Sequence, residues 1–258
     1  MLKFSANLSM LFLEYDFLDR FEAAAANGFN AVEFMFPYGY SAEQLRELME
    51  NHNLQHTLHN LPAGNWEAGE RGVACIPGRE DEFRQGVASA IAYAKVLGNR
   101  KINCLVGKTP SGVDATLVNR TLVDNLRYAA DELAKENIML LIEPINHFDI
   151  PGFHLTGTQQ ALELIKQVGS DNLFIQYDIY HMQRMEGELT QTMALHADKI
   201  GHLQIADNPG RNEPGTGEIN YDYLFDVIKQ SAYDGWVGCE YKPKKRTEDG
   251  LGWLKKYH

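Results

Sequence analysis

The stretch Met139-Leu-Leu-Ile-Glu143-Pro144-Ile145 decides how the rest of the chain is interpreted. Four apolar residues in a row are typical of a strand that is buried on both faces, as in a parallel sheet covered by helices. A glutamate and a proline then end the run. Glutamate is seldom buried without a partner, because taking a carboxylate out of water is costly. We therefore expect Glu143 to lie beside a group that compensates its charge.

Similar apolar or β-branched runs recur along the chain, and amphipathic segments separate them. The predicted strands cover 4–9, 31–36, 54–60, 101–107, 138–144, 173–179, 199–207 and 235–241. The first predicted helix begins near Phe17 and ends before Gly28, and the second begins at Ser41, which opens a capping box. The other predicted helices lie at 122–133 and at about 80–97, 158–168, 189–198, 221–231 and 248–256.

About eight strand–helix units in succession predict a closed (β/α)8 TIM barrel, as a single domain over residues 1–258. The parallel strands would form the inner wall, and the helices would cover it. A doubly wound open sheet is the alternative. It usually has fewer strands, and no GxGxxG pattern follows the first predicted strand.

Composition limits the class of partner. The formal net charge is −11, whereas nucleic acid and anionic membranes require a basic surface, so neither is expected as a partner. The three cysteines, Cys75, Cys104 and Cys239, are odd in number and form no CxxC pattern, which favours reduced thiols in a cytoplasmic protein. We predict no signal peptide and no membrane span.

Polar residues stand at the ends of the last four predicted strands: Glu143, Asp178, Gln204 and Glu240. In a TIM barrel the carboxyl ends of the strands meet at one face, where functional residues collect. Three carboxylates gathered there would repel one another, and a divalent cation would resolve the repulsion. Ligation by oxygen alone predicts Mg²⁺, or alternatively Mn²⁺, rather than zinc. The alternative is that these residues are ordinary caps and loop residues at strand–helix junctions.

Alternation along the strands extends this prediction one layer down. Gln176 and Phe174 would share the face of Asp178, and His202 and Ile200 would share the face of Gln204. Gln176 and His202 would then hydrogen-bond the metal ligands from below.

Other polar residues at predicted strand ends allow two interpretations each. Glu33 either extends the polar mouth or, as we favour, faces a helix and bonds to backbone. Asn7 and Asn60 are candidates for lining the pocket. Glycine-rich stretches at 61–78 and 208–217 predict loops that close the mouth against water.

The chain resembles the xylose-isomerase-like TIM barrel superfamily from end to end, and most closely its hydroxypyruvate isomerase branch. The resemblance is carried by FSANLSMLF, VEFMFPY, HTLHNLPAGNW, AGERG, CIPGRE, LIEPIN, IQYDIYHMQ, HLQIADNPGR, PGTGEINY and GCEYKP. It implies that Glu143 and Glu240 bind metal and act as acid and base. It also implies that Asp178 and Gln204 are metal ligands, and that His181 contacts the substrate. Arg211 lies near the position of a substrate-binding arginine.

The resemblance implies the reversible isomerisation of hydroxypyruvate to 2-hydroxy-3-oxopropanoate. A metal would stabilise the enediolate while one glutamate removes a proton and the other carboxyl delivers one. A hydride shift is the alternative mechanism. The substrate carboxylate requires a cation or hydrogen-bond donors, for which Arg211, Lys108, His59 and His181 are candidates. Lys108 would otherwise be a solvated loop lysine, and alternation places His56 and His59 on opposite faces.

Other functions stay open at this point. Within the superfamily the alternatives are a 2-oxotetronate isomerase or a small-sugar epimerase. A phosphodiesterase for abasic DNA is disfavoured by the net charge, and a non-catalytic sugar-acid binding protein by the pair of glutamates. Trp66, Phe36 and Tyr38 would either form an apolar wall of the pocket or bury an interface in a homo-oligomer.

Overall fold

All the strands belong to one parallel sheet. The computed structural model describes residues 2–257. The strands follow the order β3-β2-β1-β9-β8-β7-β6-β5-β4. Their bounds are β1 Lys3–Asn7, β2 Ala31–Glu33, β3 Gln55–His56, β4 His59–Asn60, β5 Lys101–Cys104, β6 Met139–Ile142, β7 Leu173–Asp178, β8 Ile200–Ile205 and β9 Trp236–Cys239.

The sheet closes through the strand predicted at 54–60. Only Thr57 and Leu58 separate β3 from β4, which stand at the two ends of the strand order. β3 pairs with β2, and β4 pairs with β5. Backbone bonds continue this pairing on both sides, because Phe34 N–H donates to the Leu58 carbonyl at 3.2 Å and Leu61 N–H to the Asn103 carbonyl at 2.8 Å. The predicted (β/α)8 barrel is confirmed, with its third strand bent into two short pieces.

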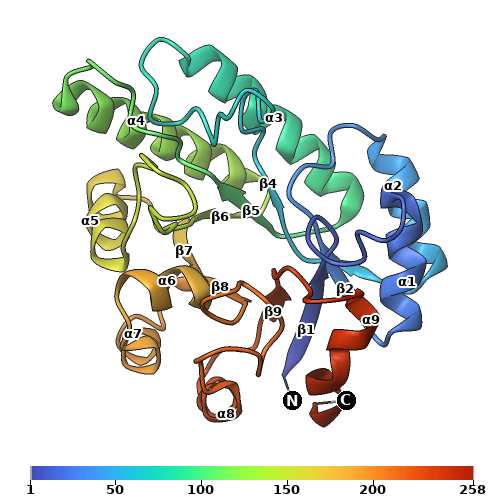
Figure 1. Cartoon of the computed structure of the whole chain (residues 1–258). Coiled ribbons are helices and arrows are strands. Elements are labelled where there is room, and N and C mark those ends of the chain that lie inside the picture. The colour runs from blue at the N-terminus through green and yellow to red at the C-terminus, as the bar shows by residue number, and fades with distance from the viewer. Residues whose placement is uncertain (1, 258) are drawn as a thin grey trace.

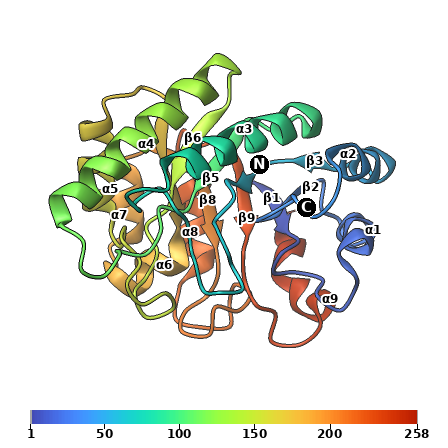
Figure 2. The ribbon, with the colours of Figure 1, turned by 90° about the horizontal axis from the view of Figure 1, so that it is seen from above.

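The helices form a ring outside the strands, as Figure 1 shows along the barrel and Figure 2 from above. Their bounds are α1 Arg20–Ala26, α2 Ala42–Asn51, α3 Glu80–Leu97, α4 Ala115–Lys135, α5 Thr158–Val168, α6 Ile179–Met185, α7 Leu189–Leu195, α8 Tyr221–Gln230 and α9 Thr247–Gly250, with 3-10 turns at Phe17–Asp19 and Leu251–Lys256. Both figures show the two ends of the described chain side by side. None of the helices within 2–257 combines the length and the apolar character needed to cross a membrane.

Local sequence signals set most helix ends. Ser41 caps α2, since its hydroxyl accepts from Gln44 N–H at 3.2 Å. Gly98 and Gly169 end α3 and α5 in the left-handed conformation, at φ of 77° and 70°. Helix α6 was not predicted. It begins directly after β7 because the Asp178 carboxylate caps it, accepting from Tyr180 N–H at 2.9 Å.

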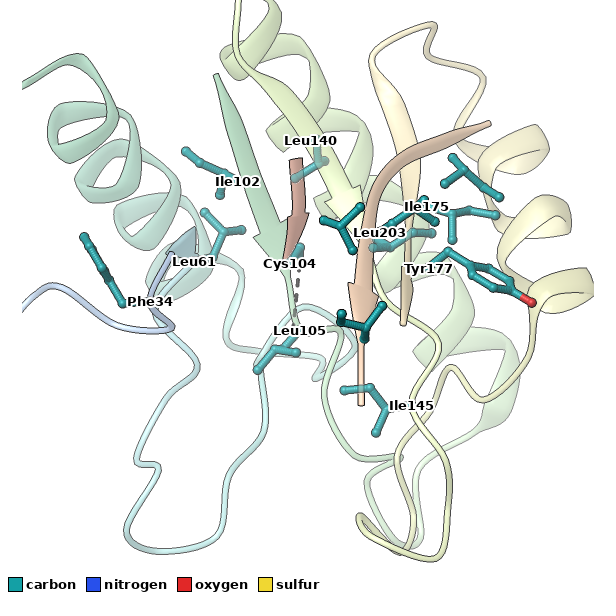
Figure 3. Packing of buried hydrophobic residues seen from close by; sticks show 14 of the residues in the cluster. Phe34, Leu61, Ile102, Cys104, Leu105, Leu140, Ile145, Ile175, Tyr177 and Leu203 are labelled. Carbon is teal, nitrogen blue, oxygen red and sulfur yellow. Dashed lines mark hydrogen bonds between the residues drawn. The ribbon is translucent and has the colours of Figure 1, made fainter. Parts of the chain in front are cut away.

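Apolar side chains fill the layer between strands and helices. Figure 3 shows part of it, with Ile102 and Leu140 beside one another on the register-paired strands β5 and β6. Inside the barrel a bulge changes the expected pattern at the start of β8. The register shifts between Ile175 and Gln176, so Ile200 pairs with Ile175 and does not share the face of His202 and Gln204. That prediction for Ile200 is wrong, because a bulge breaks strict alternation.

Candidate active site

The polar ends of the last four strands converge inside the barrel mouth. Glu143 directly follows β6, Asp178 ends β7, Gln204 lies in β8, and Glu240 directly follows β9. All four side chains are buried, with at most 6% of any residue exposed. Asp178 and Gln204 are register partners on neighbouring strands. The predicted convergence is confirmed, because parallel strands deliver their carboxyl ends to one face.

Glu143 is held from one side by two amide donors. The side-chain amides of Asn103 in β5 and Gln176 in β7 donate to its Oε2, at 3.1 and 2.9 Å. Gln176 was predicted to lie one layer below the site, and it does. The neighbouring strands therefore fix Glu143 between them and leave its other oxygen free of these bonds.

Glu240 is held in the same way. Asn7 of β1 and Gln204 of β8 donate through their side-chain amides to its Oε2, at 2.9 and 2.7 Å. Asn7, which was expected to line the pocket, lies against Glu240 at this site. Each glutamate thus has one oxygen fixed by two neutral donors from the adjacent strands, an arrangement that orients a carboxylate without neutralising it.

The remaining carboxylate oxygens face a common region that also holds two cationic or donor groups. Arg211 bonds Glu240 Oε1 at 2.6 Å and lies 3.6 Å from Asp178 Oδ2. His181 Nε2 lies 3.7 Å from Glu143 Oε1 and 3.6 Å from the same Asp178 oxygen. Asp178 Oδ2 is buried and has no hydrogen-bond partner within the described chain. Glu143 Oε1 and Asp178 Oδ2 therefore both lie near His181, and Glu240 Oε1 is joined to this pair through Arg211.

Burial and mutual repulsion disfavour the charged forms of the three carboxyl groups. Burial, followed by repulsion from Glu240 and Asp178, raises the pKa of Glu143 well above its ordinary value. Burial raises the pKa of Glu240 to about 8 and that of Asp178 to about 6, although Arg211 opposes both shifts. Burial and the nearby arginines lower the pKa of His181, which favours a neutral ring. A second positive charge beside these carboxyl groups would relieve these shifts.

Potential metal-binding atoms are close enough for such a charge. Within residues 2–257, ligand atoms of Glu143, Asp178 and His181 lie within 4.8 Å of one another. Gln204 is oriented differently from its predicted role. Its amide nitrogen faces Glu240, while its oxygen accepts from Gln176 at 2.7 Å.

Glu33 corrects the sequence interpretation. We favoured a helix-facing acid bonded to backbone, but the side chain is fully buried inside the barrel. It accepts from His202 Nε2 at 2.9 Å, from Gln204 at 2.8 Å and from Asn7 at 3.2 Å. His202 does lie below the mouth as predicted, yet its hydrogen bond goes to Glu33 rather than to one of the four predicted ligands. The side chain of Glu33 points inward because β2 pairs with β1 so that Glu33 faces Asn7.

His59 is not part of the site, so its prediction as a substrate-binding residue is wrong. Its Nε2 lies 3.3 Å from the Ala90 carbonyl of α3, on the helix side of the wall. The predicted opposition of His56 and His59 is also wrong, because their rings stack at 5.3 Å with an angle of 7° between planes. Alternation fails here because the strand bends at Thr57 and Leu58, between β3 and β4.

Lys108 lies in the loop after β5, where it forms a backbone bridge with Phe153. It is half-buried, and no hydrogen bond or ion pair of its ammonium group is found within residues 2–257. Its role toward a substrate stays a prediction. Arg211, by contrast, is placed directly at the acids by the loop that follows β8.

Aromatic residues lie beside the mouth. Phe36 and Trp66 pack at 5.0 Å and line a cavity of about 300 Å³. Tyr38 does not join this wall, since its hydroxyl donates to the Asn60 carbonyl at 2.6 Å. A larger cavity, of about 590 Å³, lies at the opposite end of the barrel among residues such as Met139 and Phe174, which start β6 and β7. It is remote from the strand ends that carry the acids.

Two contributing residues were missed from the sequence. Asn103, in the apolar run KINCLVG, holds Glu143, and Asn146, three residues after Glu143, bonds His181. The only available signal for Asn103 was a polar residue inside an apolar strand. Asn146 had none, because its role depends on the course of the loop.

Comparison with known proteins agrees with the barrel fold. The family model described as a xylose isomerase-like TIM barrel matches residues 21–257. Hydroxypyruvate isomerase from Escherichia coli (strain K12) is 72% identical over 257 residues, covering 100% of both chains. A 2-oxo-tetronate isomerase from Cupriavidus necator is 46% identical, covering 99% of this chain and 98% of the relative. A crystal structure described as AP endonuclease, family 2, from Brucella melitensis has a TM-score of 0.97 at 44% identity, covering 100% of both chains.

Proposed function

The chain belongs to the xylose isomerase-like TIM barrel family, and we propose that it isomerises hydroxypyruvate to 2-hydroxy-3-oxopropanoate, reversibly. Its curated relatives are isomerases, and so is this chain. The observation that carries the specific proposal is the pair of glutamates, each fixed through one oxygen by two amides. The other oxygen of each lies beside a group that is also 3.6 Å from Asp178 Oδ2, which is His181 for Glu143 and Arg211 for Glu240.

This pair suits proton transfer between neighbouring carbons. The substrate must lose a proton from its hydroxymethyl carbon and gain one on the adjacent carbonyl carbon. Glu143 and Glu240 directly follow β6 and β9, which are separated by β8 and β7 in the sheet. One carboxylate would accept the proton, and the other carboxyl would deliver one. Burial raises the pKa of both, which brings them toward the pH at which a group serves as acid and as base.

A divalent cation suits the donor set. Three buried carboxylates face one guanidinium, and Asp178 Oδ2 has no hydrogen-bond partner within the described chain. Glu143 and Asp178 would hold the cation through their facing oxygens. Glu240 stays a predicted ligand, with its Oε1 bonded by Arg211, whereas the Gln204 oxygen is turned to Gln176 and away from the role predicted for it. All-oxygen ligation favours Mg²⁺ or Mn²⁺. When bound, the cation would supply Lewis-acid polarisation of the substrate's oxygens.

Arg211 supplies the cation for the substrate's carboxylate in this proposal. Its guanidinium bonds Glu240 at 2.6 Å and lies 5.2 Å over the ring of Tyr180. A planar guanidinium recognises carboxylates through two parallel bonds. His181 Nε2 faces the same region and would donate to a substrate oxygen. The partner is therefore a small keto acid, and the acidic surface makes nucleic acid an unsuitable one.

A substrate panel measured with and without EDTA tests the proposal. The panel contains hydroxypyruvate, 2-oxotetronates, free ketoses and ketose phosphates. We expect turnover of hydroxypyruvate to exceed that of the others and to disappear with EDTA, returning when Mg²⁺ or Mn²⁺ is added. Faster turnover of a 2-oxotetronate would assign the activity of the 46% identical relative instead. No turnover of any member would reject the isomerase proposal.

Solvent exchange separates the two mechanisms. Proton transfer through Glu143 and Glu240 predicts deuterium in the product carbon when the reaction runs in D₂O. Complete absence of deuterium under slow turnover would favour a hydride shift.

A nuclease centre rich in histidine is a poor match here, because within residues 2–257 the close metal-capable group is two acids and one histidine.

A further inference from the structure

Asn146 is a buried residue that touches no acid of the site directly and contacts His181 instead. Its side-chain Nδ2 lies 2.6 Å from His181 Nδ1, and its backbone nitrogen lies 3.5 Å from the same atom. Asn146 is fully buried, and His181 is 2% exposed. The loop after β6 thus directs two N–H groups at one nitrogen of the ring.

The orientation of the Asn146 amide is fixed by a second contact. Its Oδ1 accepts from the backbone N–H of Asp149 at 2.8 Å, and its Nδ2 also donates to Asp149 Oδ2 at 3.2 Å. Rotating the amide by half a turn would place Nδ2 against that backbone N–H and Oδ1 against a carboxylate. Arg184 in turn bonds Asp149 at 2.5 Å. The nitrogen, and not the oxygen, therefore faces His181.

This arrangement determines which nitrogen of the imidazole ring carries the proton. Both groups facing Nδ1 are donors, so Nδ1 must accept, and it does so with its lone pair. The single proton of the neutral ring is then on Nε2. That nitrogen lies 3.7 Å from Glu143 Oε1 and 3.6 Å from Asp178 Oδ2, at the point where the acids meet. A nitrogen that carries a proton can donate a hydrogen bond but has no lone pair for a metal ion.

We propose that Asn146 is a positioning residue that holds His181 in its Nε2–H tautomer, making the ring a donor to a substrate oxygen and not a metal ligand. The distances alone place His181 within reach of an ion shared with Glu143 and Asp178. The tautomer removes it from that ligand set. The substrate-facing role rests on the proposed function, whereas the tautomer and its cause do not.

A double variant exchanges the two side chains without changing the net charge, and a single variant is its control. In the double variant Asn146→Asp with Asp149→Asn, an acceptor replaces the nearer of the two donors beside Nδ1, and the amide introduced at position 149 can donate back to the carboxylate introduced at position 146. The single variant Asp149→Asn is the control, because it keeps the amide of Asn146. This control also loses the contact between Arg184 and Asp149, so it shows what that loss does to the loop by itself.

The readout is the ¹⁵N NMR spectrum of protein labelled in its histidines, recorded with EDTA and again with Mg²⁺. The His181 signals are identified by their absence in His181→Gln. We expect an unprotonated Nδ1 and a protonated Nε2 in the native chain and in Asp149→Asn, and a protonated Nδ1 in the double variant. A protonated Nδ1 in the native chain would overturn the proposal, and this measurement does not depend on the folding of any variant. An unchanged tautomer in a folded double variant would overturn it as well.

Kinetics provide a second measurement. Loss of the oriented donor should raise KM for hydroxypyruvate roughly 10-fold in the double variant relative to Asp149→Asn. A KM equal in the two variants, with the tautomer reversed, would contradict the substrate-facing role. The spectra are recorded without turnover, so failure of the chain to isomerise hydroxypyruvate would reject the proposed function and leave the tautomer assignment standing.

Discussion

At the scale of single residues, the site depends on how each carboxylate divides its two oxygens. One oxygen of Glu143 and one of Glu240 are fixed by neutral amides, and one oxygen of Asp178 caps α6. The other oxygens of Glu143 and Asp178 are left for ligands, and that of Glu240 accepts from Arg211. Neutral amides fix the position of these oxygens and bring no positive charge of their own into the site.

Replacing Glu143 or Glu240 by glutamine tests their role as acid and base. Each variant should lose about 10²- to 10⁴-fold in kcat, because an amide neither accepts nor releases a proton at neutral pH. In EDTA each variant should remain folded, because the glutamine oxygen can still accept from the two amides that hold the glutamate oxygen. Steady-state kinetics and urea unfolding measure the two effects, and Arg184→Gln is a control outside the proposed acid–base pair. A Glu240→Gln variant with native kcat would contradict the assignment.

The pH dependence of stability follows from the raised pKa values. In the metal-free protein, Glu240 retains its proton up to about pH 8 and Asp178 up to about pH 6, whereas exposed carboxyls lose theirs near pH 4. Between these limits the folded state binds more protons than the unfolded state. The free energy of unfolding should therefore fall as the pH rises from about 5 to 8, by up to about 1.4 kcal/mol per pH unit for each retained proton.

Urea unfolding in EDTA at several pH values measures this slope. Glu240→Gln should reduce the slope between about pH 6 and 8, because one of the groups that retain a proton there has been removed. Stability that instead rises over this range in the native, metal-free chain would show that the carboxyls are ionised and otherwise compensated.

At the scale of elements, short loops at the strand ends place the remaining site residues. The segment after β4 is held against the end of β5 by close backbone approach. A Cβ on Gly72, whose φ is 115°, would come within 1.9 Å of the Leu105 carbonyl oxygen. In the same segment, the Arg71 guanidinium packs 3.8 Å over the ring of Trp66. This loop is therefore shaped by glycine conformation as much as by side-chain packing.

Substituting alanine at Gly72 should destabilise the protein by about 3 kcal/mol or more, because both the backbone angle and the space are unsuitable. Gly69→Ala is the matched control: its φ of 88° is also positive, but no atom lies within 4 Å of its added Cβ. It should cost only about 1 kcal/mol. Urea unfolding measures both, and tryptophan fluorescence reports on the loop. Equal costs for the two variants would disprove the close-approach argument.

At the scale of the whole molecule, the acids from β6, β7 and β9 form one site only when the barrel is closed. A cation held by Glu143, Asp178 and Glu240 would therefore bind the folded chain and not the unfolded one. Such binding stabilises the folded state by mass action.

Calorimetric unfolding measures this coupling. Mg²⁺ at 100 times its Kd should add about 2.7 kcal/mol, which raises Tm by roughly 5–10 °C for a chain of this size. The double variant Glu143→Gln with Glu240→Gln should show no shift. A native Tm that neither Mg²⁺ nor Mn²⁺ changes would remove the metal from the proposal.

The sequence by itself determined the alternation of strands and helices and the polar ends of the last four strands. Apolar runs of strand length and amphipathic segments specify their own local structure, and parallel strands deliver their ends to one face wherever the barrel closes. That is why Glu143, Asp178, Gln204 and Glu240 were found together from residue patterns and family resemblance alone.

Only the tertiary structure decided which way several side chains point and which partners they meet. The bend between β3 and β4 turned His59 toward α3, the bulge moved Ile200 off the face of His202, and the pairing of β1 with β2 drew Glu33 inside. The Asn146 contact with His181 depends likewise on the course of a loop. These features arise from register, bulges and loop geometry, which involve residues distant in the chain and leave no periodic trace in its sequence.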